Sequence, residues 1–374
     1  AGRVEGRRMT PEELNEFLVT EELPPSVIAF SAGLDRSRIR AYLAGDVEAL
    51  LEAERSTLRD KVIVPEHKRS ANVQEQSAVI DGAGEFLRKH SVLFHYEKGG
   101  ARQTASGSLV EIGGKLFVAT ARHTIPNGTQ MLEFVGANVT YIEASEEKVP
   151  GKRDWKGRAD IKVLKGGRHE RLDVGFIEID PFALNVLKHE SISLSSVSVG
   201  AQQYGRTAFV FGYPFELERI GKLSETERIL HAMSLTYSNP VLAPEEWPEV
   251  PSDDRQPEEH IDCLMRYSRD DQFKSIVPIG RNRNYHSVQL PELLPAVFGM
   301  SGGGFWQRWT PIADSQLWLA CDYKLFAIQS SWSERGQYIR GIQIRHWLDL
   351  VSESYPELKP LIDEHVVAQS NLAG

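Results

Sequence analysis

Three short segments constrain the fold of this chain through their order. The first, residues 116–123, is an apolar run that ends in a histidine. The second, residues 172–179, places an aspartate before an alternating apolar pattern typical of a β-strand. The third, residues 298–305, reads Phe-Gly-Met-Ser-Gly-Gly-Gly-Phe and sets a serine among glycines. A fold that unites these segments must supply histidine, aspartate and serine in that order along the chain.

These residue types predict nucleophilic acyl chemistry. Ser301 is the expected nucleophile, because neighbouring glycines leave its turn open to an approaching substrate. A serine hydroxyl attacks only when a base takes its proton, and His123 is the expected base. Asp173 is expected to fix the imidazole tautomer and to stabilise the imidazolium. The backbone N–H groups of Gly299 and Ser301 are expected to form the oxyanion hole.

The same motifs resemble those of the chymotrypsin/trypsin-like serine protease family, in its bacterial, intracellular type. Ala-Arg-His123 corresponds to the histidine motif, Leu-Asp173-Val to the aspartate motif and Gly-Met-Ser301-Gly-Gly to the serine loop. Residues 324–332 resemble a later strand that lines the substrate cleft, and Phe-Gly-Tyr-Pro at 211–214 resembles a mid-domain turn. The resemblance implies a mainly β fold of two antiparallel barrels.

The resemblance also implies a catalytic triad of His123, Asp173 and Ser301 that cleaves peptide bonds through an acyl-enzyme, without a cofactor. By the family's spacing the base of the primary pocket falls at Pro295. No acid stands there, so an apolar or small substrate side chain is expected rather than Arg or Lys. The expected pocket wall consists of Ser330, Ser331 and Trp332.

Met300 stands where many secreted relatives carry an aspartate that pairs with a newly freed N-terminus. A thioether cannot make that ion pair. Activation by proteolytic cleavage is therefore not expected, and regulation would act through conformational change or a partner protein.

An α/β-hydrolase offers another setting for a Gly-x-Ser-x-Gly sequence. That fold needs the order serine, acid, histidine. Only 73 residues follow Ser301, which leaves little room for the remaining strands and helices. Residues 302–304 are all glycine, which is a poor helix start. The sequence therefore argues against this fold.

Short strands separated by turn signals fill the middle of the chain. A hairpin is expected over residues 106–120, with Gly113 and Gly114 at its turn. Further strands are expected near residues 131–135, 159–164, 174–179, 207–212, 229–237, 324–331 and 338–344. This pattern favours packed antiparallel barrels. Residues 91–367 are expected to form this protease domain, with one C-terminal helix over 344–367 packed on the second barrel.

The N-terminal segment, residues 9–60, has a helical pattern that resembles the repressor-like helix-turn-helix family. A small residue at Ala29, a glycine at Gly33 and apolar side chains further on fit that motif. The second helix is expected to start at Asp35 or Ser37 and to be docked by Leu34, Ile39 and Tyr42. Residues 61–90 are expected to be a linker, with a short helix at 83–89.

Arg36, Arg38 and Arg40 are the candidate nucleic-acid contacts of this module. Residues 1–60, however, carry eight Arg and no Lys against twelve acids, a net charge of −4. DNA-binding domains usually carry a basic surface. DNA therefore stays an alternative partner, and docking of an activating or other protein is favoured.

Residues 240–260 combine five prolines with seven acids, a composition that predicts an exposed loop without a core. The simpler interpretation is a surface insertion without a function of its own. The alternative is a regulatory loop that gates substrate access or attracts basic peptides.

Whole-chain composition limits the remaining classes. A net charge of −9 over 374 residues disfavours broad adhesion to nucleic acid. Two cysteines, Cys263 and Cys321, indicate a reducing compartment rather than a disulfide framework, so a cytoplasmic location is expected. No metal-binding motif and no apolar run of membrane-spanning length occurs in the sequence.

Taken with the motifs above, the sequence predicts a serine endopeptidase that acts on protein or peptide. The alternative is a DNA-binding or protein-docking regulator whose protease-like domain acts as a sensor.

Overall fold

The structure is a computed structural model, and it divides into two compact units. It describes residues 10–20, 34–61, 83–98, 101–125, 131–135, 141–144, 158–200, 204–217, 219–222, 227–231, 233–252, 254–269, 274–278, 295–308 and 323–373. One unit comprises residues 1–76 with 203–207 and 240–247. The other comprises residues 77–202, 208–239 and 248–374.

The smaller unit is helical over most of its described N-terminal part. Its elements are α1 (Pro11–Thr20), α3 (Arg36–Leu43), the 3₁₀ turn η1 (Val47–Ala49) and α4 (Glu52–Lys61). Asp35 caps α3 by accepting hydrogen bonds from the amides of Ser37 and Arg38, which confirms one of the two expected helix starts. A small core holds the module together, formed by Leu14, Ile39, Tyr42, Leu50 and Leu58. The expected first helix of the helix-turn-helix, around residues 25–33, lies outside the described residues.

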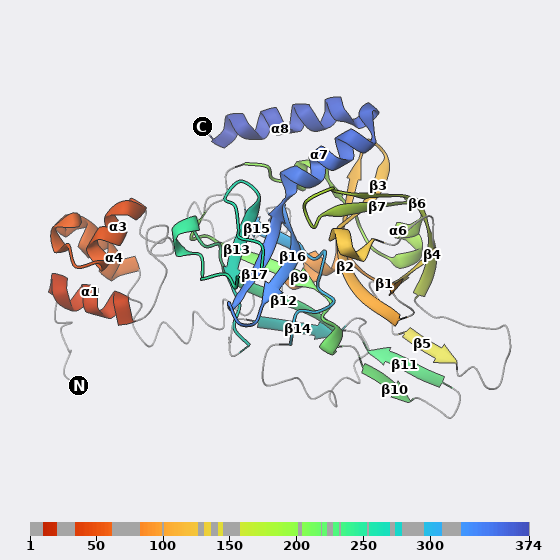
Figure 1. The fold of residues 1–374 in the computed structure, drawn as a ribbon, viewed down its shortest axis with the longest axis horizontal. Helices are drawn as coiled ribbons and strands as arrows, with labels where there is room; N and C mark the ends of the chain where they lie inside the picture. The colour runs from red at the N-terminus through yellow and green to blue at the C-terminus, as the bar shows by residue number, and fades with distance from the viewer. Residues whose placement is uncertain are drawn as a thin grey trace, which may run out of the picture. The chain divides into compact units, whose positions relative to one another are not determined.

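The larger unit is mainly β and contains two large antiparallel sheets (Figure 1). The barrel strands of the first sheet are β1 (Ser91–Lys98), β2 (Ala101–Ile112), β3 (Lys115–Thr120), β4 (Met131–Val135), β6 (Arg158–Arg168) and β7 (Gly175–Ile179). This sheet closes on itself, because β1 pairs with both β4 and β2. The short β8 (Ile192–Ser193) adds parallel to β2. A closed barrel leaves few edges for unwanted pairing.

The second large sheet is a curled half-barrel. Its order is β13 (Asp262–Arg266), β17 (Tyr338–Gln343), β16 (Tyr323–Ser333), β15 (Gly304–Arg308), β9 (Thr207–Gly212), β12 (Met233–Pro240) and β14 (Lys274–Pro278). A third sheet of three strands contains β10 (Arg219–Lys222), β11 (Glu227–His231) and β5 (Tyr141–Ala144). The expected mainly β fold, with two barrel-type sheets preceded by a small helical part, is confirmed in this form.

Local sequence explains several of these elements. Gly113 and Gly114 both have positive φ, +57° and +79°, as the two central residues of a tight hairpin turn require. On β3, Leu116 and Val118 face the interior of the closed barrel, whereas Phe117 faces a second core shared with the other sheet. Both faces of this strand are therefore buried, and its sequence is apolar without alternation.

The strand expected over residues 229–237 is wrong as a single element. β11 ends at His231 and β12 begins at Met233, and the two belong to different sheets. Local pattern did not reveal the break, because the partner strands that separate them lie elsewhere in the chain.

The single C-terminal helix is also wrong. The structure has α7 (Ile344–Ser354) and α8 (Lys359–Ala373), separated by the 3₁₀ turn η8 (Pro356–Leu358). Pro356 cannot continue a helix from the preceding turn. α7 lies beside β3 and β7 (Figure 1), and the ring of Trp347 packs edge-on against Phe117 with centroids 6.2 Å apart. α7 therefore packs on the closed barrel as well as on the second sheet.

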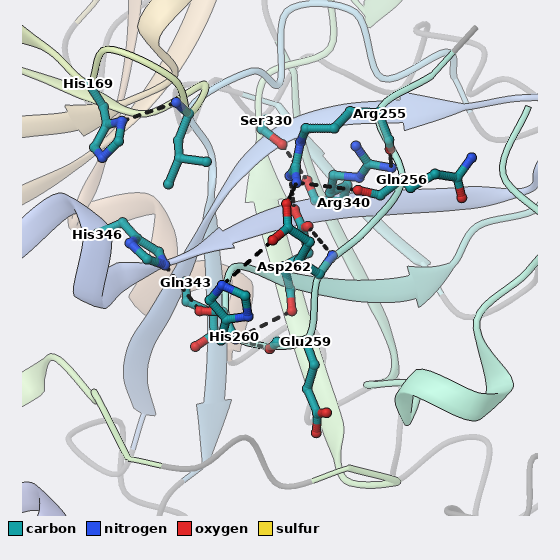
Figure 2. Close-up of polar contacts among 12 residues, drawn as sticks. His169, Arg255, Gln256, Glu259, His260, Asp262, Ser330, Arg340, Gln343 and His346 are labelled. Carbon is teal, nitrogen blue, oxygen red and sulfur yellow. Dashed lines mark hydrogen bonds and ion pairs between the residues drawn. The ribbon is translucent and has the colours of Figure 1, made fainter. Parts of the chain in front are cut away.

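The segment 240–260 is not a loop without contacts. Val241, Leu242 and Ala243 are buried. Further along, the carboxylate of Asp254 accepts a hydrogen bond from the Tyr338 hydroxyl at 3.0 Å. Figure 2 shows Arg255 against Asp262, and the backbone oxygens of this stretch accept hydrogen bonds from side chains of β17 and α7. Several of its polar groups are therefore engaged in structural contacts.

Candidate active site

His123 and Asp173 meet because two neighbouring strands run antiparallel. His123 lies in the 3₁₀ turn η2 (Arg122–Thr124), directly after β3, and Asp173 stands two residues before β7. Thr120 at the end of β3 pairs with Gly175 at the start of β7. This register brings the two side chains together at one rim of the closed barrel.

The carboxylate of Asp173 binds His123 twice. Oδ2 lies 2.8 Å from the ring Nδ1, and Oδ1 accepts the backbone N–H of His123 at 3.1 Å. This arrangement favours a proton on Nδ1 and leaves Nε2 as the basic nitrogen. Among the described residues Nε2 has no hydrogen-bond partner, and the His123 side chain is 39% exposed. The ring can therefore take a proton from a group that reaches the surface of the barrel.

The turn that carries Asp173 is braced by His169, which sequence reasoning missed. Its Nδ1 accepts the amides of Arg171 and Leu172 at 3.2 and 3.1 Å. Its own amide donates to the Val174 carbonyl at 3.0 Å. Burial, and then the neighbouring His346, lower the pKa of His169, so the neutral acceptor form is favoured.

A second brace comes from the helical turn itself, since the Arg122 guanidinium donates to the Glu170 carbonyl. Figure 2 shows His169 and His346 close together, with ring centroids 6.4 Å apart. The sequence signal for the contact made by His169 was a histidine four residues before Asp173, which is a weak signal.

Ser301 lies in a tight loop that leads into β15. Gly299 and Gly302 both have φ of +91°, a conformation that favours glycine. A Cβ at Gly302 would overlap Thr120 Oγ1 and the Ser106 carbonyl oxygen. The loop is thus pressed against β2 and the end of β3, the strand that leads to His123.

The structure does not join all three predicted catalytic side chains. In the described part of the chain, no hydrogen bond links Ser301 Oγ to the His123 ring. The backbone of Ser301 is nevertheless fixed, since its carbonyl accepts the Ser106 amide at 3.0 Å. Hydrogen bonds between nucleophile and base are often long without substrate and tighten in the complex.

Within residues 299–303, two backbone amides have no acceptor in the part of the chain that the structure describes. Met300, Gly302 and Gly303 donate their amides to the carbonyls of Val297, Gln329 and Met300, at 3.0, 2.8 and 2.7 Å. The amides of Gly299 and Ser301 have no acceptor among the described residues. These are the two N–H groups that the sequence predicted for the oxyanion hole.

The peptide planes that carry those donors are themselves held. The Phe298 carbonyl, which shares a plane with the Gly299 amide, accepts the Phe215 amide at 2.6 Å. The Met300 carbonyl, which shares a plane with the Ser301 amide, accepts the Gly303 amide at 2.7 Å. Both free N–H groups therefore have fixed directions.

The four predicted pocket residues separate into two groups. Pro295 is buried and its carbonyl accepts the Tyr267 hydroxyl, whereas Ser330 is buried and donates to the Arg340 carbonyl at 3.4 Å. Ser331 is exposed and Trp332 is half-buried. Only the last two present their side chains at the surface.

Two exposed aromatic side chains near the serine loop were missed. Phe298 is 64% exposed and its ring lies edge-on to Trp332, with centroids 5.5 Å apart. Phe215 is 56% exposed and adjoins Gly299. Exposed rings of this size often mark binding surfaces. Phe298 stood inside the serine motif, but nothing in the sequence indicated that it would be exposed.

The three arginines of α3 are all engaged with carboxylates. Arg38 pairs with both oxygens of Glu54. Arg36 and Arg40 both pair with Glu245, at 3.0 and 3.4 Å.

Within the described residues no cluster of three or more His, Cys, Asp or Glu could hold a metal ion. Among the helices that the structure describes, none has the length and hydrophobicity needed to cross a bilayer.

Comparisons with known proteins give the following picture. No protein-family model and no characterised protein sequence matches this chain significantly. Among solved structures, an inactivated protease paralogue of the scabies mite is similar at 13% identity and TM-score 0.41, over 72% of this chain and 96% of that one. The protease Anisep of Arthrobacter nicotinovorans is similar at 14% identity and TM-score 0.36, over 72% and 95%. The HtrA-type protease AlgW is similar at 11% identity and TM-score 0.38, over 73% and 62%. Similarity this distant concerns the course of the backbone, so activity has to be inferred from the side chains of the site.

Proposed function

We propose that this chain is a serine endopeptidase, a hydrolase that cleaves peptide bonds through an acyl-enzyme. The observation that carries the proposal is that two hydrogen bonds join Asp173 to His123 and leave Nε2 of the His123 ring available. Two free amides in the neighbouring serine loop support it, because a tetrahedral oxyanion needs such donors.

In the proposed acylation step, Ser301 Oγ attacks the scissile carbonyl carbon while its proton passes to His123 Nε2. For this transfer Oγ must come within about 2.6–3.2 Å of Nε2 as substrate binds. Asp173 stabilises the imidazolium that forms. The oxyanion accepts hydrogen bonds from the amides of Gly299 and Ser301, and the C–N bond then breaks as Nε2 returns the proton to the leaving amine.

Deacylation repeats the chemistry with water. A water molecule attacks the ester carbon and gives a proton to Nε2. The tetrahedral intermediate collapses, the carboxylic acid leaves, and Ser301 Oγ recovers its proton from His123. Atoms and charges balance without a cofactor.

The substrate is proposed to be a protein or peptide with an apolar side chain at the cleavage site. Ser331 and Trp332 line this part of the surface, and the exposed ring of Phe298 extends it. Aromatic rings contribute large apolar contact area at low entropic cost. Pro295 and Ser330, which are buried, are proposed to form the pocket behind this surface.

For the helical module we propose protein docking rather than DNA binding. Phosphate contacts by Arg36, Arg38 or Arg40 would require their ion pairs with Glu54 and Glu245 to open. Titration with duplex DNA at two salt concentrations tests this. Tight binding with a steep loss of affinity at high salt would favour DNA instead.

We also propose a reducing, cytoplasmic location. Cys263 is buried and free, and burial raises the pKa of its thiol, which keeps it protonated and unreactive. Cys321 lies outside the described residues.

Labelling with a fluorophosphonate probe tests the proposed activity. Wild type should be labelled, whereas Ser301→Ala should not, and His123→Ala should be slower by ~10³-fold or more. Ser195→Ala is the matched control, since Ser195 is exposed and, among the residues described, its hydroxyl bonds Ser193 at 2.7 Å. Labelling of Ser301→Ala at the wild-type rate, or no labelling of wild type, would remove the proposal.

A further inference from the structure

Ser106 connects the closed barrel to the serine loop. It stands on β2, and its side chain is completely buried. Its backbone amide donates to the Ser301 carbonyl at 3.0 Å, and its carbonyl accepts Thr120 Oγ1 at 2.8 Å. The residue thereby joins the loop to the strand that leads to His123.

The hydroxyl of Ser106 makes two further hydrogen bonds. Oγ donates to the Gly299 carbonyl at 2.9 Å and accepts the Tyr213 amide at 2.9 Å. A hydroxyl has one proton to donate, so this geometry uses the donor fully and one of its lone pairs. Ser106 therefore binds the carbonyls of the two residues, Gly299 and Ser301, whose amides are free.

These contacts complete the fixation of the serine loop. The Phe298 and Met300 carbonyls bind the amides of Phe215 and Gly303, and Ser106 binds the two carbonyls that alternate with them. Four consecutive peptide planes, from Phe298 to Gly302, are thus held through their carbonyl oxygens. A plane with a bonded carbonyl cannot turn over, because its N–H would then point the opposite way.

In the described part of the chain, no charged side chain hydrogen-bonds residues 299–303; the Glu216 carboxylate accepts the amide of Ala296, three residues before Gly299. Met300 is fully buried, and its side chain packs close to Gly212. An apolar side chain excludes water but sets no hydrogen-bond direction, so the orientation of the loop depends on its backbone partners. Among the described residues, the Ser106 hydroxyl is the side-chain group that hydrogen-bonds the backbone of residues 299–303.

We propose that Ser106 is a positioning residue that holds the serine loop in its oxyanion-binding conformation, so that the loop needs no proteolytic activation. This inference rests on the proposed function, because it assigns the two free amides to an oxyanion. Ser106 itself does not contact substrate, since its side chain is buried beneath the loop.

Ser108 provides a matched control. It lies two residues further along β2, is also fully buried, and its Oγ has no partner among the described residues. Ser108→Ala therefore removes a buried hydroxyl from the same strand without removing a hydrogen bond. Ser106→Cys keeps a side chain of similar shape with a weaker donor, and it serves if Ser106→Ala folds poorly.

The test measures fluorophosphonate labelling as a function of probe concentration, which separates the maximal rate from the half-saturating concentration. Ser106→Ala should lower the maximal rate by ~10- to 100-fold, in the range for loss of an oxyanion contact, with the half-saturating concentration unchanged. The maximal rate of Ser106→Cys should lie between those of wild type and Ser106→Ala, and the maximal rate of Ser108→Ala should match that of wild type. A general loss of folded protein would reduce the labelled fraction but not the rate of the fraction that reacts.

Amide hydrogen exchange of the unlabelled protein gives a readout that does not need activity. Ser106→Ala should speed exchange at the hydrogen-bonded amides of Tyr213, Met300, Gly302 and Gly303 by about tenfold or more relative to Ser108→Ala. Unchanged exchange and an unchanged maximal rate would overturn the role of Ser106. If wild type is not labelled, the proposed protease activity fails, while the exchange data still decide whether Ser106 holds the loop.

Discussion

Asp173 fixes His123 through both carboxylate oxygens, one on the ring at 2.8 Å and one on the backbone amide at 3.1 Å. The first bond sets the tautomer and the second sets the position of the main chain. A single side chain thereby orients the proposed base in two independent ways.

Asp173→Asn should slow fluorophosphonate labelling by ~10³- to 10⁴-fold. An amide can present its NH₂ group to Nδ1 and favour the wrong tautomer, as known for aspartate-to-asparagine changes in triads. The rate at saturating probe is the measurement. Asp180→Asn is the control, because Asp180 is exposed and its carboxylate accepts the Phe182 amide at 2.8 Å in a surface turn. Equal rates for the two variants would contradict a role of Asp173 in catalysis.

Gly302→Ala should destabilise the protein by ~2–5 kcal/mol and abolish labelling. A side chain at φ +91° is strained, and its Cβ would also overlap Thr120 and Ser106. Gly114→Ala isolates the first effect, since Gly114 has φ +79° but no other atom within 4 Å of the place where a Cβ would stand. Gly114→Ala should lower the free energy of unfolding by only ~1–2 kcal/mol. Urea denaturation measures both, and equal costs would show that the contact with β2 and β3 does not matter.

Met300→Asp should cost more than ~3 kcal/mol, because it places a carboxylate in a fully buried site beside Gly212. Met300→Leu conserves volume and should cost less than ~1.5 kcal/mol, with labelling retained. Thermal unfolding of both variants is the check. A stable Met300→Asp protein that labels only after limited proteolysis would mean that this chain can after all be controlled by cleavage.

His169→Ala should slow labelling about tenfold at neutral pH, because the turn that holds Asp173 loses the acceptor for two amides. His169→Asn supplies a side-chain oxygen and should recover part of the rate. If the alanine and asparagine variants are equally slow, the ring is needed for packing and not as an acceptor.

Lowering the pH should slow fluorophosphonate labelling of wild type, because the turn that holds Asp173 depends on neutral His169 as an acceptor. The pKa of His169 is lowered by burial and by His346, while Glu353 and Glu170 oppose this and Arg122 adds to it. Protonation of Nδ1 therefore requires a pH below the ordinary value of ~6.5, and it converts the acceptor into a donor that repels two amides. The loss should be reversible and should be reduced in His169→Asn.

His189 should make folding stability sensitive to acid. Burial lowers its pKa to about 4, and its ring nitrogens lie 3.2 and 3.3 Å from the carbonyls of Lys89 and Val135. The folded state binds the proton less readily than the unfolded state, so the stabilisation is complete above pH ~6.5 and is lost as pH falls toward 4. The loss should reach about 3 kcal/mol.

Urea denaturation of wild type and His189→Gln between pH 8 and 4 tests this. The variant should lack this part of the pH dependence while differing from wild type by a roughly constant amount above pH 7. Parallel curves over the whole range would show that His189 is not responsible.

Much of the fold could be predicted because its signals are local. Apolar runs and alternation marked strands at residues 131–135 and 207–212 with the bounds observed, and Gly113-Gly114 marked a hairpin turn that needs positive φ twice. For residues 240–260 the predicted exposure holds at 254–256 and 258–260, but the expected lack of a core is wrong at the buried Val241, Leu242 and Ala243. Composition also did not reveal that Asp254 and Arg255 bind side chains of β17 and β13. Which charge meets which partner is not visible in composition.

The candidate site shows the same division. By itself the sequence determined the chemistry available, with His123, Asp173 and Ser301 in order and glycines at the two positions of left-handed backbone, because side-chain type and local conformation are encoded within a few residues. Only the tertiary structure decided that Thr120 pairs with Gly175 and so joins His123 to Asp173. It alone placed Ser106 under a loop nearly two hundred residues away. Hydrogen bonds of this kind depend on strand register and on packing between sheets, which no local pattern specifies.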